Sequence, residues 1–168
     1  MHPYNASGWN RSSVYEKMGF GQFLSLENFH HGEQLRKYVS DQADFEEVLD
    51  VLNQSTDPAF IFNVTMQNHS SYGTPYDNFT PSIEAKFENT NSTKYLNNYL
   101  SLMKYTDDAV KYLLTELSAS DKKTIVVFFG DHQPNDYVVE PIYEENGLDI
   151  NNQTLEEQQK RQQVPFFI

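Results

Sequence analysis

One apolar run, residues 124–129, constrains the fold more than any other stretch of this sequence. A continuous run of this kind is typical of a strand covered on both faces, as in a mainly parallel sheet under helices. The run ends at Gly130 and is followed at once by Asp131 and His132. Ligands gather at the carboxyl ends of such strands, and a glycine permits the turn that brings neighbouring side chains to one ion. A carboxylate beside an imidazole suits Zn²⁺ or Mn²⁺. A capped strand end with a solvent-facing histidine is the alternative interpretation.

Residues 59–66 form a second near-continuous apolar run, and His69 follows it. Between the two runs, apolar residues recur at helical spacing over residues 93–117. A strand, a helix and a second strand predict a right-handed βαβ crossover, in which both strands end at the same edge of the sheet. We therefore expect a three-layer α/β/α fold with a mainly parallel sheet, and His69 and His132 at one edge of it.

The same patterns predict where the other elements and the core lie. Ser40 and Asp41 are expected to cap a helix, a shorter helix is expected to stop at Gly19, and residues 70–91 are expected to form a polar loop. A short helix over residues 155–161 and an apolar strand from residue 164 follow. The expected core is Phe60, Ile61, Phe62, Val64, Leu100, Met103, Val110, Leu114, Ile125, Val126, Val127 and Phe128.

Composition restricts the classes of function. The 168 residues are 38% hydrophobic and 14% aromatic, which is sufficient for a folded domain with a core. The formal net charge of -12, without a basic cluster, argues against nucleic-acid binding. An anionic substrate would therefore need a metal ion or a few well-placed cations. The sequence contains no cysteine, which excludes disulfides, and no apolar run is as long as a membrane span.

Three polar clusters have both a functional and a structural interpretation. An aromatic residue beside an arginine, as in Trp9-Asn10-Arg11, can hold an anionic or sugar-like ligand. On this triplet alone, a packed loop with a surface arginine is the simpler interpretation. His30 and His31 suggest a metal site, but no carboxylate falls at a recognised spacing, so an exposed loop is expected. Asp107 and Asp108 are expected to be solvated on the outer face of their helix.

Taken together, these motifs resemble the lipoteichoic acid synthase branch of the sulfatase and alkaline phosphatase superfamily, the bacterial phosphoglycerol transferases. The resemblance covers nearly the whole chain and keeps the family's order. It is carried by His2-Pro3-Tyr4, Trp9-Asn10-Arg11, Thr65-Met66-Gln67-Asn68-His69, the helix with Tyr105-Thr106-Asp107, Val127-Phe128-Phe129-Gly130-Asp131-His132, and Gln163-Val164-Pro165-Phe166-Phe167.

The resemblance implies a metal-dependent enzyme that transfers phosphoglycerol from a phosphatidylglycerol-like lipid. It implies that Asp131 and His132 bind a divalent metal, first of all Mn²⁺, with Zn²⁺, Mg²⁺ or Ca²⁺ as alternatives. It implies that His69, Arg11 and Trp9 contact the substrate, an anionic phospholipid or a phosphoglycerol polymer. Gln133-Pro134 departs from many synthases, so sulfatase-like ester hydrolysis and phosphoethanolamine transfer remain alternatives. A metal- or partner-binding module without turnover is an alternative of another class.

By the same resemblance, residues 1–168 correspond to the C-terminal part of an alkaline-phosphatase-like catalytic domain, cut at both ends. The family's nucleophilic threonine and its acidic metal ligand have no counterpart in this sequence, so we expect the nucleophile upstream. The chain alone is then expected to be inactive and to self-associate. The complete enzyme is expected on the extracytoplasmic face of a bacterial membrane, anchored through segments outside this chain.

Overall fold

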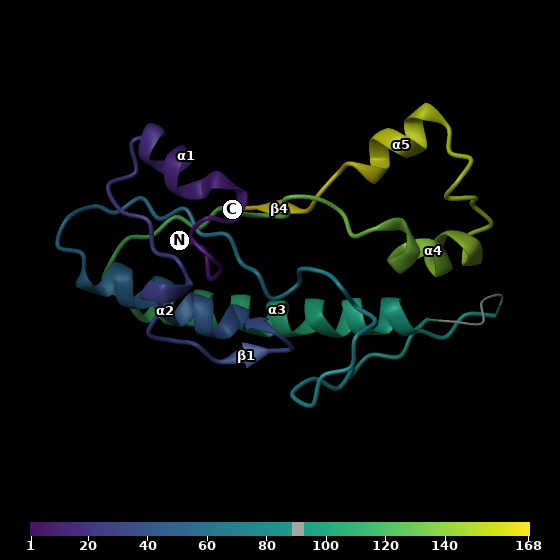
Figure 1. Ribbon diagram of the computed structural model, residues 1–168, viewed down its shortest axis with the longest axis horizontal. Helices are drawn as coiled ribbons and strands as arrows, with labels where there is room; N and C mark the ends of the chain where they lie inside the picture. The colour runs from purple at the N-terminus through teal and green to yellow at the C-terminus, as the bar shows by residue number, and fades with distance from the viewer. Residues whose placement is uncertain (89–92) are drawn as a thin grey trace. The chain divides into compact units, whose positions relative to one another are not determined.

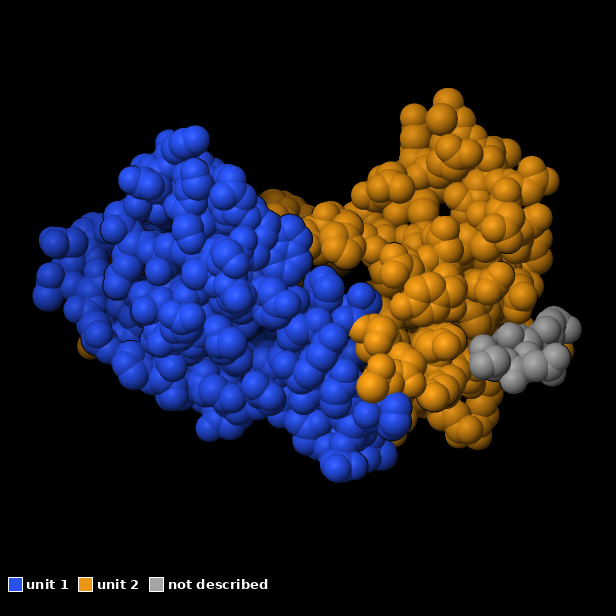
Figure 2. All heavy atoms as spheres, viewed as in Figure 1, with its two compact units in different colours: residues 1–70, 75–80, 102–120 blue, residues 71–74, 81–101, 121–168 orange. Residues whose placement is uncertain are grey.

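The computed structural model describes residues 1–88 and 93–168, which form two compact units (Figures 1 and 2). The polar loop was predicted over residues 70–91, and its last residues, from 89 on, lie outside the described part of the chain. The units are divided as follows: unit 1 contains residues 1–70, 75–80 and 102–120, and unit 2 contains residues 71–74, 81–101 and 121–168.

Unit 1 is built from short helices, one hairpin and part of a long helix. Its elements are the 3₁₀ helices η1 (Gly8–Asn10) and η2 (Leu26–Asn28), the helices α1 (Arg11–Lys17) and α2 (Asp41–Gln54), and the strands β1 (Gln34–Leu35) and β2 (Tyr38–Val39). The helix α3 (Lys94–Ala119) contributes its first residues to unit 2 and the rest to unit 1. The predicted cap of α2 is confirmed, because the Ser40 side chain accepts a hydrogen bond from the Ala43 amide.

Unit 2 contains the strands β3 (Phe128–Phe129) and β4 (Phe166–Phe167) and the helices α4 (Asp136–Glu145) and α5 (Leu155–Arg161). The predicted helix over residues 155–161 is confirmed, and Thr154 and Glu157 form a capping box at its start. Helix α4 was not expected. It contains Pro141, a residue that argues against a helix when it is read from sequence alone.

The predicted parallel sheet is not formed by the described residues. Both assigned sheets are two-stranded and antiparallel, β1 with β2 and β3 with β4. Residues 59–66 carry no assigned strand. The Met1 amine donates to Phe62 O, the Val64 amide donates to Met1 O, and Met66 O accepts from the His69 amide in a turn. An apolar run predicts an extended segment, but a ladder also needs a partner bonded at successive residues.

The predicted core was also wrong in its membership. None of the twelve expected residues is fully buried, and Phe60 and Ile125 are 81% and 83% exposed. Helix α3 carries apolar residues on two faces, and periodicity alone does not say which face is buried. In unit 1 the buried face of α3 carries Leu102, Ala109 and Leu113, whereas Met103 and Leu114 are exposed. Within the described residues, no helix is long and apolar enough to cross a membrane.

Candidate functional site

The Trp9 loop of unit 1 has an unusual backbone. Trp9 and Asn10 both adopt left-handed conformations, with φ of 53° and 55°. This region is uncommon for residues other than glycine and is unfavourable for a bulky side chain such as tryptophan. Such strain persists where the surrounding structure holds it, and it is frequent at ligand-binding sites. The Trp9 side chain is 56% exposed, so the strained loop presents an aromatic face to solvent.

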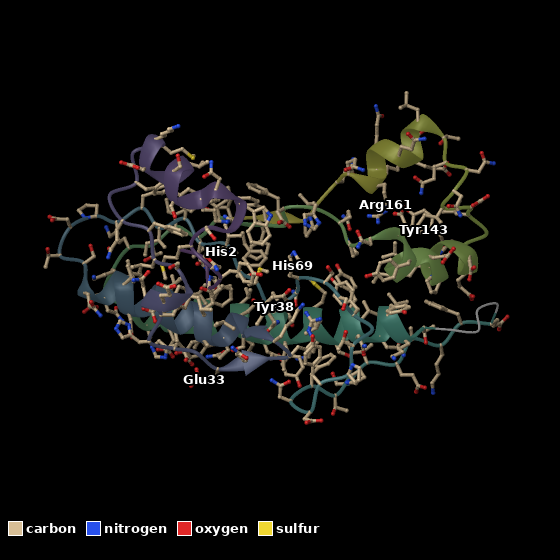
Figure 3. All side chains as sticks on the ribbon, viewed as in Figure 1. His2, Glu33, Tyr38, His69, Tyr143 and Arg161 are labelled. Carbon is tan, nitrogen blue, oxygen red and sulfur yellow. The ribbon has the colours of Figure 1, made fainter. Side chains whose placement is uncertain are left out.

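An aromatic cluster surrounds His69 in the same unit. The ring centroids of Trp9 and Tyr38 lie 5.9 Å and 5.7 Å from that of His69, both edge-on. His2 and Tyr4 extend the cluster, at 5.4 Å and 5.5 Å from Trp9. Figure 3 labels His2, Tyr38 and His69, which come from three segments far apart in sequence. The fold therefore brings two predicted substrate residues, Trp9 and His69, together.

The β1–β2 hairpin fixes the turn that carries His69. Arg36, at the first position of the hairpin turn, has a φ of 59° and is only 4% exposed. Its Nη2 atom donates to the carbonyl oxygens of Gln67 at 2.7 Å and His69 at 2.8 Å. Tyr38 adds its hydroxyl, 3.3 Å from His69 Nδ1. Hydrogen bonds from a charged donor are the stronger class, so this buried arginine is the main anchor of the turn.

A polar network beneath the turn ties it to α2 and α3. The Asp41 amide donates to Gln67 Oε1 at 3.0 Å, and Gln67 Nε2 donates to Thr106 Oγ1 at 3.2 Å. The Thr106 hydroxyl donates to Asp41 Oδ2 at 2.5 Å, which closes the network. Asp41 is fully buried, and this desolvation raises the pKa of its carboxyl to about 6.

Arg11 supplies a positive charge beside the aromatic cluster. Its guanidinium carbon lies 5.3 Å from the centre of the Trp9 ring, and its Nη1 donates to the Tyr15 hydroxyl at 2.5 Å. Within the described residues Arg11 forms no ion pair with a carboxylate. In a chain with a net charge of -12, an arginine without a carboxylate partner is well suited to an anionic ligand.

His2 is a neutral acceptor in the same cluster, and before the structure only its place in the family resemblance pointed to it. It is 1% exposed, and desolvation lowers its pKa to about 4, so it is uncharged at neutral pH. Nδ1 lies 2.8 Å from the Val64 carbonyl oxygen and therefore carries the proton. Nε2 is left as a buried acceptor with no partner in the described part of the chain. A ligand hydroxyl would satisfy it.

Asp131 and His132 are found together in unit 2, both with side chains 75% exposed. His132 Nδ1 lies 2.8 Å from the Gln133 carbonyl oxygen, so the proton is on Nδ1 and the lone pair is on Nε2. Nε2 lies 3.6 Å from Asp131 Oδ2. Metal ligands at about 2.0–2.2 Å from one ion are about 3–4 Å apart, so these two atoms fit a shared divalent metal.

The turn that carries this pair is held by the residues that precede β4, the strand paired with β3. The Gly130 amide donates to the Pro165 carbonyl at 3.1 Å, and Gln133 donates to the Gln163 carbonyl. A Cβ at Gly130 would lie 3.3 Å from Val164 Cβ, so the turn leaves little room for a side chain. Trp9, Arg11 and His69 belong to unit 1 and the Asp131–His132 pair to unit 2, and their meeting at one edge stays a prediction.

Comparison with known proteins identifies the family. The sequence matches the Sulfatase family profile over residues 1–168. The chain belongs to the sulfatase family. It is 33% identical over 135 residues to a putative cyclic beta-1,2-glucan modification protein of Rhizobium meliloti, and 25% identical over 135 residues to the lipoteichoic acid synthase-like YvgJ of Bacillus subtilis. These matches cover 80% and 78% of this chain, and it spans about a fifth of each relative, 21% in both cases.

A solved structure supports the fold of this sulfatase-family chain. It aligns with the lipoteichoic acid synthase LtaP of Listeria monocytogenes at a TM-score of 0.70 and 22% identity, covering 98% of this chain and 40% of that one. The resemblance to the lipoteichoic acid synthase branch is thereby confirmed, and so is an alkaline-phosphatase-like α/β fold. Enzymes of the family generally use a divalent metal, and Asp131 and His132 are side chains of the types that bind one.

Proposed function

We propose that this chain is part of a phosphoglycerol transferase of the lipoteichoic acid synthase type, which takes phosphoglycerol from a phosphatidylglycerol-like lipid. The main support is the group of Trp9, Arg11 and His69, which combines one unpaired positive charge with exposed aromatic faces. A phosphodiester with a small polyol headgroup carries the complementary features: one negative charge, an aliphatic edge and free hydroxyls.

In this proposal each residue of unit 1 has a separate task. The Arg11 guanidinium binds the phosphate oxygens by charge-assisted hydrogen bonds. The Trp9 ring contacts the carbon atoms of the glycerol, and His2 Nε2 accepts a hydrogen bond from one of its hydroxyls. His69, held by Arg36 and Tyr38, has its ring 5.9 Å from that of Trp9 and contacts the phosphate or the leaving oxygen. These contacts orient the phosphate for attack, and orientation supplies much of the rate in phosphoryl transfer.

Asp131 and His132 hold the divalent metal, with Mn²⁺ as our proposal. When bound, such an ion polarises phosphoryl oxygens and stabilises charge that develops in the transition state. The Nδ1–H bond to the Gln133 carbonyl selects the tautomer whose lone pair is on Nε2, the nitrogen that would face the metal. The attacking threonine that the resemblance implies has no counterpart in residues 1–168, and the transfer itself therefore needs the complete gene product.

Two kinds of acceptor for the phosphoglycerol group fit the proposal. The relative from Rhizobium meliloti is named for modification of a cyclic glucan, whereas YvgJ is named for likeness to lipoteichoic acid synthase. Both kinds of acceptor offer a hydroxyl, on a sugar or on a glycerol. A carbohydrate acceptor is thus a second candidate, and it changes the second half-reaction only.

A lipid-substrate assay tests this function. We expect the complete gene product, placed in vesicles, to release diacylglycerol from phosphatidylglycerol faster than from phosphatidylethanolamine, and to leave an aryl sulfate intact. Addition of a glycerol phosphate polymer or of a cyclic glucan shows which acceptor receives labelled glycerol. Arg11→Ala should raise KM more than it lowers kcat, since it removes a charge-assisted contact, and Lys17→Ala serves as a control with the same change of charge. Preferential cleavage of the sulfate ester, or no lipid cleavage at all, would contradict the proposal.

A further inference from the structure

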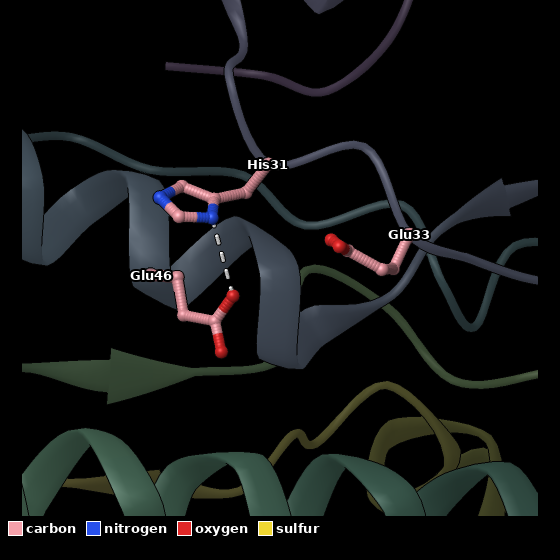
Figure 4. A group of neighbouring side chains, drawn as sticks. All are labelled: His31, Glu33 and Glu46. Atoms are coloured by element: carbon pink, nitrogen blue, oxygen red, sulfur yellow. Dashed lines mark ion pairs between the residues drawn. The ribbon is translucent and has the colours of Figure 1, made fainter.

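A second cluster of ligand-type side chains lies away from the aromatic cluster, where the loop before β1 meets α2. His31, Glu33 and Glu46 each offer one ligand atom, and these atoms all lie within 4.8 Å of one another (Figure 4). His31 and Glu33 come from the loop, and Glu46 comes from the helix. The sequence did not reveal this group, because Glu46 is far from His31 along the chain and the two do not match a recognised spacing of metal ligands.

Asp50 determines which nitrogen of His31 faces the two glutamates. Asp50 Oδ2 lies 2.9 Å from His31 Nε2, and a carboxylate only accepts, so Nε2 carries a proton. Nδ1 then faces Glu46 Oε2 at 3.3 Å. In a neutral imidazole this places a lone pair against a carboxylate oxygen, which is repulsive unless a proton or a metal ion lies between the two atoms. A carboxylate that orients a histidine from its far nitrogen is the usual second layer of a metal site.

The loop is fixed in this position by a buried carboxylate. Glu47 is 2% exposed, and its Oε2 accepts hydrogen bonds from the amides of His30 at 2.7 Å and His31 at 3.2 Å. The backbone that carries His31 is therefore held against α2 independently of any ion pair made by the imidazole. Glu33, in contrast, makes no side-chain hydrogen bond or ion pair within residues 1–88 and 93–168.

We propose that His31 Nδ1, Glu33 and Glu46 bind one Zn²⁺ ion, with Asp50 orienting the imidazole. Ligand atoms about 2.0–2.1 Å from a tetrahedral ion are about 3.3 Å apart, which matches the distance from Nδ1 to Glu46 Oε2. One imidazole and two carboxylates suit Zn²⁺, whereas Mg²⁺ and Ca²⁺ prefer oxygen ligands alone. The negative charge of the three carboxylates around His31 (Glu33, Glu46 and Asp50) also exceeds the positive charge of one imidazolium. A divalent ion therefore balances this charge better than a proton does. The ion would fasten the loop before β1 to α2.

Calorimetric titration with Zn²⁺ tests the site. The chain carries Asp131→Asn and His132→Gln, so that the other metal pair does not contribute. We expect about one Zn²⁺ per chain, with Mg²⁺ not competing. Glu33→Gln and Glu46→Gln should each weaken binding at least tenfold, and Asp50→Asn should do so by about ten- to a hundredfold. Glu16→Gln, an equivalent change on α1, should leave the affinity unchanged.

Proton NMR of the chain without any change at this site gives a second measurement that does not depend on folding of the variants. Zn²⁺ should shift the ring protons of His31 and leave those of the exposed His30 in place. Absence of Zn²⁺ binding, binding that persists in both glutamine variants, or a His31 ring that does not respond would each overturn the proposal. If Zn²⁺ does not bind, His31 is an imidazolium in an ion pair with Glu46 and Asp50.

Discussion

Replacement of Asp41 by asparagine should make the protein more stable at neutral pH. Asp41 is fully buried, and burial raises its pKa from 3.8 to about 6, a shift that corresponds to about 3 kcal/mol. Because the folded carboxyl keeps its proton to a higher pH than the unfolded one, the free energy of unfolding falls as the pH rises from about 4 to about 6 and stays lower above that. The dipole of α2 favours an anion at its start by only about 0.3–1 kcal/mol, so desolvation wins.

The asparagine keeps an oxygen that accepts the Thr106 hydroxyl but has no charge to bury. We expect Asp41→Asn to match the wild type within about 1 kcal/mol at pH 4 and to exceed it by about 2–3 kcal/mol at pH 7, as measured by urea unfolding in EDTA. Asp57→Asn, at an exposed aspartate, should follow the wild type at both pH values. If the variant and the wild type differ by the same amount at pH 4 and pH 7, burial of the charge is not what destabilises the folded state.

Three further substitutions test the packing and the two anchored turns. Leu102→Ala removes a fully buried side chain and should cost about 3 kcal/mol in urea unfolding, whereas Met103→Ala, at a 38% exposed neighbour, should cost under about 1 kcal/mol. Arg36→Lys cannot reproduce the guanidinium contacts to the His69 turn, so we expect weaker binding of glycerol phosphate in NMR titrations with the fold retained in circular dichroism. Gly130→Ala places a methyl group 3.3 Å from Val164 Cβ, in the segment before β4. It should therefore weaken Mn²⁺ binding, as measured by electron paramagnetic resonance. Equal losses of stability in Leu102→Ala and Met103→Ala would contradict the first expectation. Unchanged binding of glycerol phosphate by Arg36→Lys would contradict the second, and an unchanged Mn²⁺ affinity of Gly130→Ala the third.

Local signals in the sequence predicted the helices α2 and α5 and the proximity of Asp131 and His132. The cap at Ser40 and the box at Thr154 act within one turn of helix, so their outcome depends little on distant residues. Asp131 and His132 are neighbours in sequence, and the turn after Gly130 keeps them together. Trp9 and Arg11 are likewise close in sequence, and their stacking follows from one short loop.

Contacts between distant segments were not predictable in the same way. His2 bonds to the Val64 carbonyl beside the Met1–Val64 backbone pairing, and Tyr38 reaches His69 from the β1–β2 hairpin. No spacing in the sequence encodes either contact. The burial of α3 was misjudged because both of its apolar faces satisfy helical periodicity. The metal interpretation of His30 and His31 was set aside for want of a carboxylate at a recognised spacing, because the proximity of Glu46, on α2, to His31 becomes visible only in three dimensions.

Metal-dependent turnover of phosphatidylglycerol tests the central claim most directly. After removal of bound metal, Mn²⁺ should restore diacylglycerol release by the complete gene product. His132→Ala should remain inactive at every Mn²⁺ concentration that saturates the wild type, because it removes one of the two proposed metal ligands. Arg11→Ala should recover activity with the wild-type Mn²⁺ requirement but with a higher KM for the lipid. Wild-type turnover by His132→Ala in the absence of metal would contradict the account, since the Asp131–His132 pair would then have no part in the reaction.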